Sequence, residues 1–155
     1  MGIEIEKKFL LKNDDWKKEA DNGEQFRQGY MSGSNRSSIR IRVAGEKANI
    51  NIKSATLGVT RKEYEYEIPV EDANEMLDTM CEKPFIEKHR YFVVRGAHTW
   101  EIDVFEGDNE GLVVAEIELS DPEEPFDIPG WIGDDVSEDP KYYNVCLVNH
   151  PYKDW

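Results

Sequence analysis

The sequence predicts a mainly β fold with a few helices, and three observations lead to this prediction. Apolar and polar residues alternate with a period of two in about eight short segments, as in β-strands that have two different faces. Gly, Asn, Asp or Ser residues separate most of these segments, as expected for turns. The length of 155 residues is typical of one domain, so we expect a single domain over residues 1–155.

The predicted strands are distributed over most of the chain. They are residues 3–9, 25–31, 39–43, 50–53, 61–68, 86–91, 101–104 and 116–119. In the first of them, the apolar residues Ile3 and Ile5 lie on the face opposite to Glu4. Closing about eight such strands into a barrel would place all the charged faces in one polar lumen, with the apolar residues facing outward under the helices.

Helical spacing is rare in this sequence. Residues 71–80 place apolar side chains at helical intervals and predict one amphipathic helix. Asn13 or Asp14 is a suitable N-cap for a short helix that ends at Ala20. Residues 141–148 are the candidate for a third helix.

A proline-rich, acidic segment precedes that last helix. Residues 121–140 contain four prolines, which predicts an irregular arm rather than a regular element. Between Asp121 and Asp139 this arm carries eight acidic residues and no basic one. It is either a solvated surface or a cap over one mouth of the barrel.

The composition excludes several classes of protein. The net charge is −14, from 33 acidic and 19 basic residues, and a chain this acidic repels nucleic acids and anionic membranes. No apolar run approaches the ~18 residues that a membrane-spanning helix needs, and the N-terminal residues resemble neither a secretory signal nor a transit peptide. The two cysteines, Cys81 and Cys146, have no metal-binding spacing and are expected to be reduced thiols, although one long-range disulfide is the alternative. We therefore expect a cytoplasmic protein without nucleic-acid or membrane partners.

At least five of the predicted strands carry two like charges on one face. These doublets are Glu4/Glu6, Arg40/Arg42, Glu63/Glu65, Lys88/Arg90 and Glu116/Glu118. On a sheet that faces water, such charges would simply be solvated. Same-face neighbours lie about 6.6–7 Å apart along a strand, however, and repeated like charges at this spacing lower stability unless ions of opposite charge lie over them. Basic doublets suit phosphate oxygens and acidic doublets suit divalent cations, so a metal ion together with a polyphosphate would satisfy both.

The order of these residues resembles that of the CYTH family, the triphosphate tunnel metalloenzymes. Glu4-Ile5-Glu6-Lys7-Lys8 matches the ExExK motif that opens the family, and the resemblance continues to about residue 148. The further matches are Arg40-x-Arg42, Lys53, Arg61-x-Glu63-Tyr64-Glu65, Lys88-x-Arg90, Asp103 and Glu116-x-Glu118. The resemblance implies an eight-stranded antiparallel closed barrel, or tunnel, with a C-terminal plug helix. It also implies binding of triphosphate-containing substrates with Mg²⁺ or Mn²⁺.

The resemblance further implies roles for individual residues. The implied metal ligands are Glu4, Glu6, Glu116, Glu118 and, for a second metal ion that positions the attacking water, Asp103. The implied substrate-binding residues are Lys8, Arg40, Arg42, Lys53, Arg61, Arg90 and, on the C-terminal helix, Lys141. The implied catalytic residues are Lys88, which protonates the leaving phosphate, together with Glu6 and Tyr30.

Some of these assignments have alternatives when the residues are considered alone. Tyr30 is then interpreted as a packing residue, whereas Lys141 is equally consistent with an exposed lysine of a helix. Glu63 and Glu65 either contact metal or water, or orient Arg61 and Lys53 through ion pairs.

The function that the resemblance implies is hydrolysis of inorganic triphosphate to pyrophosphate and phosphate, with metal-activated water attacking a terminal phosphate. The chain has neither the His nor the residues before Glu4 with which class IV adenylyl cyclases begin, and it is shorter than vertebrate-type thiamine triphosphatases. The alternatives are hydrolysis of nucleoside or thiamine triphosphates, a class IV-type cyclase, and a non-catalytic polyphosphate-binding module. The expected partner is a small-molecule triphosphate, and both a monomer and a homodimer are compatible with the sequence.

Overall fold

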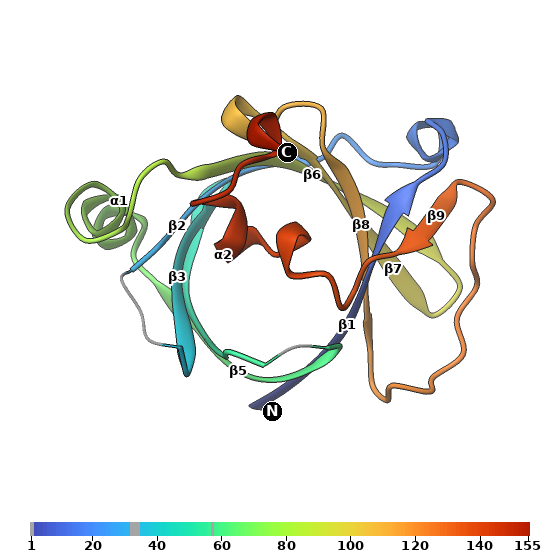
Figure 1. The fold of residues 1–155 in the computed structure, drawn as a ribbon, viewed down its shortest axis with the longest axis horizontal. Helices are drawn as coiled ribbons and strands as arrows, with labels where there is room; N and C mark the ends of the chain where they lie inside the picture. Colours follow the sequence, from blue (N-terminus) through green and yellow to red (C-terminus); the bar gives the residue numbers. More distant parts are fainter. Residues whose placement is uncertain (1, 32–34, 57) are drawn as a thin grey trace.

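The barrel dominates the computed structural model, which describes residues 2–31, 35–56 and 58–155. Within them, nine strands form one antiparallel sheet: β1 (Gly2–Leu11), β2 (Glu24–Tyr30), β3 (Ser37–Ala44), β4 (Lys47–Ser54), β5 (Thr60–Ile68), β6 (Ile86–Arg95), β7 (His98–Phe105), β8 (Val113–Leu119) and β9 (Ile132–Asp135). Eight of them close into a barrel because β5 pairs with both β4 and β1. Figure 1 shows this ring of strands in end view. The predicted eight-stranded antiparallel barrel is confirmed.

Strand β1 joins three other strands. On one side it pairs with β8 through residues 5–10. On the other side it pairs first with β5 through residues 2–5 and then with β9 at Phe9 and Leu11. Strand β9 therefore lies outside the ring of eight. The prediction of an irregular arm was wrong over the four residues of β9. These residues show no alternation that would predict a strand, and they pair because the edge of β1 is open there.

The hydrophobic core lies mostly outside the barrel. Outward-facing residues of β1, β7 and β8, such as Phe9 and Trp100, pack beneath Trp16 and Trp131, which belong to segments outside the ring. A second core forms where helix α1 (Val70–Thr79) buries Leu77 against β3 and β4. The apolar residues of these strands face outward as expected, but both helix α1 and the segment that contains Trp131 cover them.

The helices are shorter than the sequence predicts, apart from α1, which confirms the helix expected at 71–80. The first is a single 3₁₀ turn, η1 (Asp15–Lys18), in which the side chain of Asn13 accepts a hydrogen bond from the backbone N–H of Asp15. The segment 141–148 is divided by the extended residue Tyr143 into η3 (Pro140–Tyr142) and α2 (Asn144–Leu147). Two further 3₁₀ turns are η2 (Gly107–Asn109) and η4 (Tyr152–Asp154). In the described part of the chain, no helix has the length and apolar character needed to cross a membrane.

The acidic arm, residues 121–139, packs along the outside of the barrel (Figure 1). Its aromatic residues Phe126 and Trp131 lie with their ring centroids 5.8 and 5.9 Å from that of Trp100. Most of its acidic side chains are exposed. The interpretation as a cap over the barrel mouth is therefore wrong, because the aromatic residues between the acids anchor the arm to the outer wall.

The C-terminal segment, residues 140–148, lies inside the ring of strands (Figure 1). Tyr142, Leu147 and Val148 pack there against lumen-facing apolar residues of the barrel, among them Ile86 and Phe105. The implied plug is present, as a 3₁₀ turn followed by four α-helical residues rather than as one continuous helix. The free thiols Cys81 and Cys146 are both half-buried.

Candidate active site

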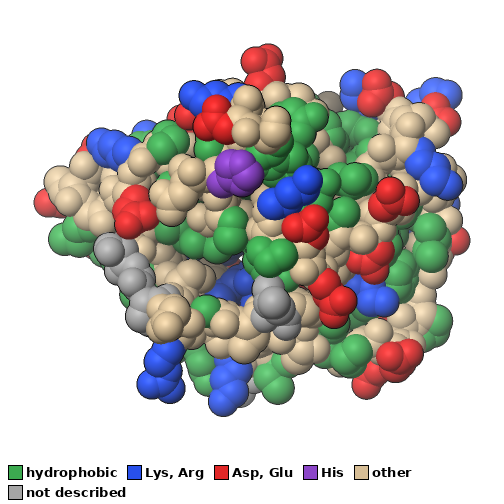
Figure 2. Space-filling model, in the orientation of Figure 1, with side chains coloured by type: hydrophobic (Ala, Val, Ile, Leu, Met, Phe, Trp, Pro, Cys, Tyr) green, Lys and Arg blue, Asp and Glu red, His purple; other side chains and the backbone are tan. Residues whose placement is uncertain are grey.

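The lumen contains a cavity of about 490 Å³ with strongly charged walls. Of the 22 described residues that line it, seven are basic and seven are acidic. They are Lys8, Arg40, Arg42, Lys53, Arg61, Lys88 and Arg90, and Glu4, Glu6, Glu63, Glu65, Glu101, Glu116 and Glu118. Figure 2 shows a hollow in this face of the molecule with a Lys or Arg side chain at its bottom. The lumen is therefore balanced in charge although the whole chain carries −14.

Strand geometry brings these residues together. Side chains at positions i and i+2 of a strand share a face, so each like-charge doublet points into the lumen. The antiparallel register then places opposite charges side by side, as for Lys8 and Glu116 in the β1–β8 pair and Arg90 and Asp103 in the β6–β7 pair. Twelve of the 14 site residues that the sequence predicts, Tyr30 included, line the cavity; the exceptions are Asp103 and Lys141.

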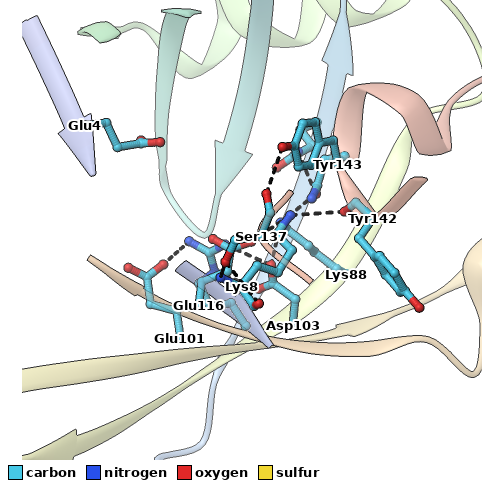
Figure 3. A network of polar contacts seen from close by, with 12 residues as sticks. Glu4, Lys8, Lys88, Glu101, Asp103, Glu116, Ser137, Tyr142 and Tyr143 are labelled. Carbon is cyan, nitrogen blue, oxygen red and sulfur yellow. Dashed lines mark hydrogen bonds and ion pairs between the residues drawn. The ribbon is translucent and has the colours of Figure 1, made fainter. Parts of the chain in front are cut away.

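Asp103 lies behind the cavity wall, between two cations (Figure 3). Its carboxylate accepts a hydrogen bond from Lys88 Nζ at 2.7 Å and two from the Arg90 guanidinium at 2.7 and 2.9 Å. Burial raises the pKa of this fully buried carboxyl, but the charges of Arg90 and Lys88 outweigh burial and lower the pKa overall. Both oxygens of Asp103 are thus occupied in orienting lumen cations.

Lys88 is almost fully buried, with 1% of its side chain exposed. Burial lowers the pKa of its ammonium to about 7, aided by the positive charges of Arg90 and Arg42 and opposed by Asp103. An amine with such a pKa exchanges a proton readily near neutral pH, which is the property required of a general acid or base.

Arg42 is a lumen cation without an ion pair among the described residues. Its Nε donates to Gln28 at 2.8 Å, and its guanidinium lies 4.7 Å from the ring centroid of Phe26. Burial, Arg40 and Arg90 together lower the pKa of Arg42 to about 9. Desolvation and mutual repulsion of this kind are relieved by a bound anion.

The acidic residues form two carboxyl pairs. Burial and the neighbouring acids raise the pKa of Glu6 well above its usual range, and Glu6 shares a hydrogen bond with Glu116. Burial raises the pKa of Glu116, but the positive charges of Lys8 and Arg90 outweigh burial and hold this pKa well below its usual range. Burial and a hydrogen bond with Glu63 likewise raise the pKa of Glu4. Each pair therefore brings two carboxyl groups together where a divalent cation would relieve their repulsion.

Glu63 and Glu65 both form ion pairs with lumen cations. Glu63 lies 3.4 Å from Lys53 Nζ, which also donates to Glu4 at 3.0 Å. Glu65 lies 3.7 Å from the Arg40 guanidinium and accepts a hydrogen bond from Asn51. Both residues also line the cavity.

Lys141 lies outside the lumen. Its side chain is exposed, and its ammonium sits over the ring of Trp155 at 4.4 Å from the centroid. The residues of the C-terminal segment that do line the cavity are Tyr143, Asn144 and Val145.

Sequence reasoning missed several lumen residues. Glu101, which forms an ion pair with Arg90, shares the face of Asp103, so its spacing of two could have revealed it. Asn144 and Tyr143 reach the lumen from the C-terminal plug that the family resemblance implies, but no local pattern shows which residues of the plug face the cavity.

Together, the fold and the site define a closed antiparallel barrel with a charged internal tunnel. The chain belongs to the CYTH domain family, which matches residues 2–146. An inorganic triphosphatase of Acetivibrio thermocellus is 50% identical over 155 residues, which cover 100% of this chain and 99% of the relative. An inorganic triphosphatase of Nitrosomonas europaea is 35% identical over 153 residues, covering 94% of this chain and 96% of the relative.

Solved structures share this fold. The crystal structure of the inorganic triphosphatase NE1496 is 31% identical, with a TM-score of 0.64 over 94% of this chain and 93% of that one. The PH1012 protein of Pyrococcus horikoshii OT3 is 22% identical, with a TM-score of 0.62 over 77% of this chain and 81% of that one. The second similarity concerns the fold alone.

Proposed function

We propose that this protein hydrolyses inorganic triphosphate to pyrophosphate and phosphate inside the barrel, with Mg²⁺ or Mn²⁺ as cofactor. The observation that carries the proposal is the lumen cavity, in which seven basic and seven acidic side chains face one another and Arg42 lacks an ion pair among the described residues. The identity of 50% with a protein named inorganic triphosphatase supports the choice of substrate.

The basic residues of the lumen hold the phosphate groups. These residues are Lys8, Arg40, Arg42, Lys53, Arg61 and Arg90. Arginine binds two phosphate oxygens at once through its planar fork, and a buried cation gains most from such a partner. Lys141 is left out of this set because its side chain lies outside the lumen.

The acidic residues Glu4, Glu6, Glu116 and Glu118 would hold the metal ion. The described residues contain no group of three or more His, Cys, Asp or Glu residues arranged as a ready-made metal site. Mg²⁺ does not require one, because it commonly uses one or two carboxylates and completes its shell with substrate phosphates and water. The repulsion between the neighbouring acids Glu6 and Glu116, which helps to raise the pKa of Glu6, fits a position that a divalent cation occupies. When bound, the ion polarises phosphoryl oxygens and makes water more acidic.

Lys88 supplies or holds a proton at Nζ beside the phosphate chain. A pKa of about 7 lets it protonate the leaving phosphate oxygen near neutral pH. Asp103 fixes the position of Nζ through the hydrogen bond of 2.7 Å, so we assign it a positioning role rather than a place in the metal set. Tyr30 lines the cavity and also packs in the apolar plug cluster, so it shapes the wall beside Gln28, whose amide donates to the Tyr30 hydroxyl.

The test is phosphate release from inorganic triphosphate, ATP, thiamine triphosphate and pyrophosphate, each with Mg²⁺, Mn²⁺ or EDTA. We expect metal-dependent cleavage of inorganic triphosphate at a rate far above the other three. Faster cleavage of ATP or thiamine triphosphate would show that the substrate is an organic triphosphate. Formation of cyclic AMP from ATP would identify a cyclase. Folded protein that releases phosphate from none of them would contradict hydrolysis and leave a binding module.

A further inference from the structure

The C-terminal segment inside the barrel contacts the lumen cations as well as the apolar plug. The backbone carbonyl of Tyr142 accepts a hydrogen bond from Lys8 Nζ at 3.1 Å. The ring of the next residue, Tyr143, lies 5.5 Å from the guanidinium of Arg61. Figure 3 shows both tyrosines beside the lumen network. These contacts come from consecutive residues and reach the neighbouring strands β1 and β5, so the segment lies at the level of the lumen cations.

The third consecutive residue, Asn144, contacts Lys88. Its Oδ1 accepts a hydrogen bond from Lys88 Nζ at 2.9 Å, while Asp103 accepts another at 2.7 Å. Among the described residues, these two oxygens are the hydrogen-bond acceptors of Nζ. An ammonium has three N–H donors, so the third donor remains for a ligand in the cavity that Lys88 and Asn144 both line.

The orientation of the Asn144 amide follows from its other neighbour. Arg42 has only donors, so the Gln28 oxygen must face it, and this contact is 2.8 Å long. Gln28 Nε2 then points to Asn144 Oδ1 at 3.2 Å and to the Tyr30 hydroxyl at 3.1 Å. A reversed Asn144 amide would bring three donors together: its own nitrogen, Gln28 Nε2 and Lys88 Nζ. Gln28 is fully buried, so water cannot relieve such a conflict.

We propose that Asn144 is a positioning residue for Lys88, held in its working orientation by Gln28 and Arg42. This proposal rests on the proposed function, because it assigns Lys88 the proton-transfer role. A lysine side chain has four rotatable bonds, and one fixed contact with Asp103 leaves Nζ free to turn about it. The second contact, from Asn144, directs the remaining N–H toward the cavity. A misplacement of about 1 Å at such a position can lower a rate by about 10²-fold.

The apolar contacts of the segment allow this role to be tested separately from folding. Leu147 and Val148 anchor the plug, so Asn144→Leu removes the amide without removing the anchor. We expect kcat for inorganic triphosphate to fall about 10²-fold with KM within about threefold of the parent value. Asn144→Asp keeps an acceptor oxygen and is expected to recover kcat to within about tenfold, with a raised KM because a carboxylate repels phosphate. Cys146→Ala, in the same helix, is the matched control and should keep the parent kcat and KM.

A second variant approaches the same contact from the barrel wall. Gln28→Glu keeps the acceptor for Arg42 but removes the N–H that faces Asn144, so the amide of Asn144 should turn and kcat should fall. The inference is overturned if Asn144→Leu keeps the parent kcat, if Asn144→Asp is as slow as Asn144→Leu, or if KM rises as much as kcat falls. Thermal unfolding of each variant identifies a general loss of structure. Inactive parent protein would instead contradict the proposed function, so the two failures are distinguishable.

Discussion

The inner surface of the barrel around the cavity and the outer surface have opposite chemistry, although the same strands form both. The inner surface carries 14 charged residues around a cavity, whereas the outer surface of β1, β7 and β8 is an aromatic and aliphatic core beneath the arm. A similar contrast separates two arginines of β6. Arg90 contacts Asp103 inside the lumen with 8% of its side chain exposed, and Arg95 pairs with Glu19 outside with 30% exposed.

This difference explains how the protein tolerates a polar interior. Ions in a low-dielectric lumen are costly even when they are paired, so the lumen contributes little net stability. Burial of apolar side chains on the outer face contributes roughly 1.5–3 kcal/mol for each large residue. The arm and the helices therefore stabilise the fold from outside, and the lumen can keep an arrangement of charges that suits a ligand.

The largest effect is expected at the centre of the lumen. Lys88→Met keeps the volume of the side chain but removes the proton, so kcat for inorganic triphosphate should fall by about 10²–10⁴-fold. Binding of triphosphate to the variant, measured by calorimetry, should change far less, because six other basic residues line the cavity. Equal losses of turnover and binding would place Lys88 among the phosphate-binding residues instead.

The opposite result is expected on the outer wall. Trp131 is 2% exposed and packs on Trp100, so Trp131→Ala should lower the free energy of unfolding by about 3–5 kcal/mol. At a temperature where the variant is still folded, its kcat should match that of the parent. Urea unfolding and phosphate release at the same temperature measure the two quantities. A variant with parent stability and reduced kcat would show that the arm acts on the lumen.

The barrel and its lumen could be predicted because strand alternation records them directly. Each doublet, such as Arg40/Arg42, indicates which face of its strand points inward, and closure of the sheet brings these faces together in the lumen. Strand β9 could not be predicted, because its pairing depends on the edge that β1 leaves open. The plug was expected from the family resemblance, but the cavity-lining positions of Tyr143 and Asn144 could not be predicted, because they depend on how the C-terminal segment enters the ring. The position of Lys141 over Trp155 likewise follows from that path and not from its local sequence.

A smaller effect links Lys88 to pH. In the folded protein its pKa is about 7, whereas the unfolded chain holds this proton up to a pKa of 10.5. Between these values the unfolded state binds more protons, so the contribution of Lys88 to the free energy of unfolding rises with pH. The gain from pH 7 to pH 9 should be about 2–3 kcal/mol. The difference between parent and Lys88→Met in urea unfolding, without metal or phosphate, measures it. A difference that stays constant over this range would show that Lys88 keeps its proton in the folded lumen.

The smallest effect is expected at the outer ion pair. Arg95 contacts Glu19 at 2.8 and 2.9 Å and Asp127 at 3.1 Å, but all three side chains are partly exposed to water. Arg95→Met should therefore lower the free energy of unfolding only slightly, and 1 M salt should abolish most of the difference. Its matched partner is Arg90→Met, which leaves Asp103 buried without one of its two cations and should cost about 3–5 kcal/mol. Equal losses at the two sites would remove the distinction between the two surfaces, because the cost of separating a buried pair is what sets the lumen apart.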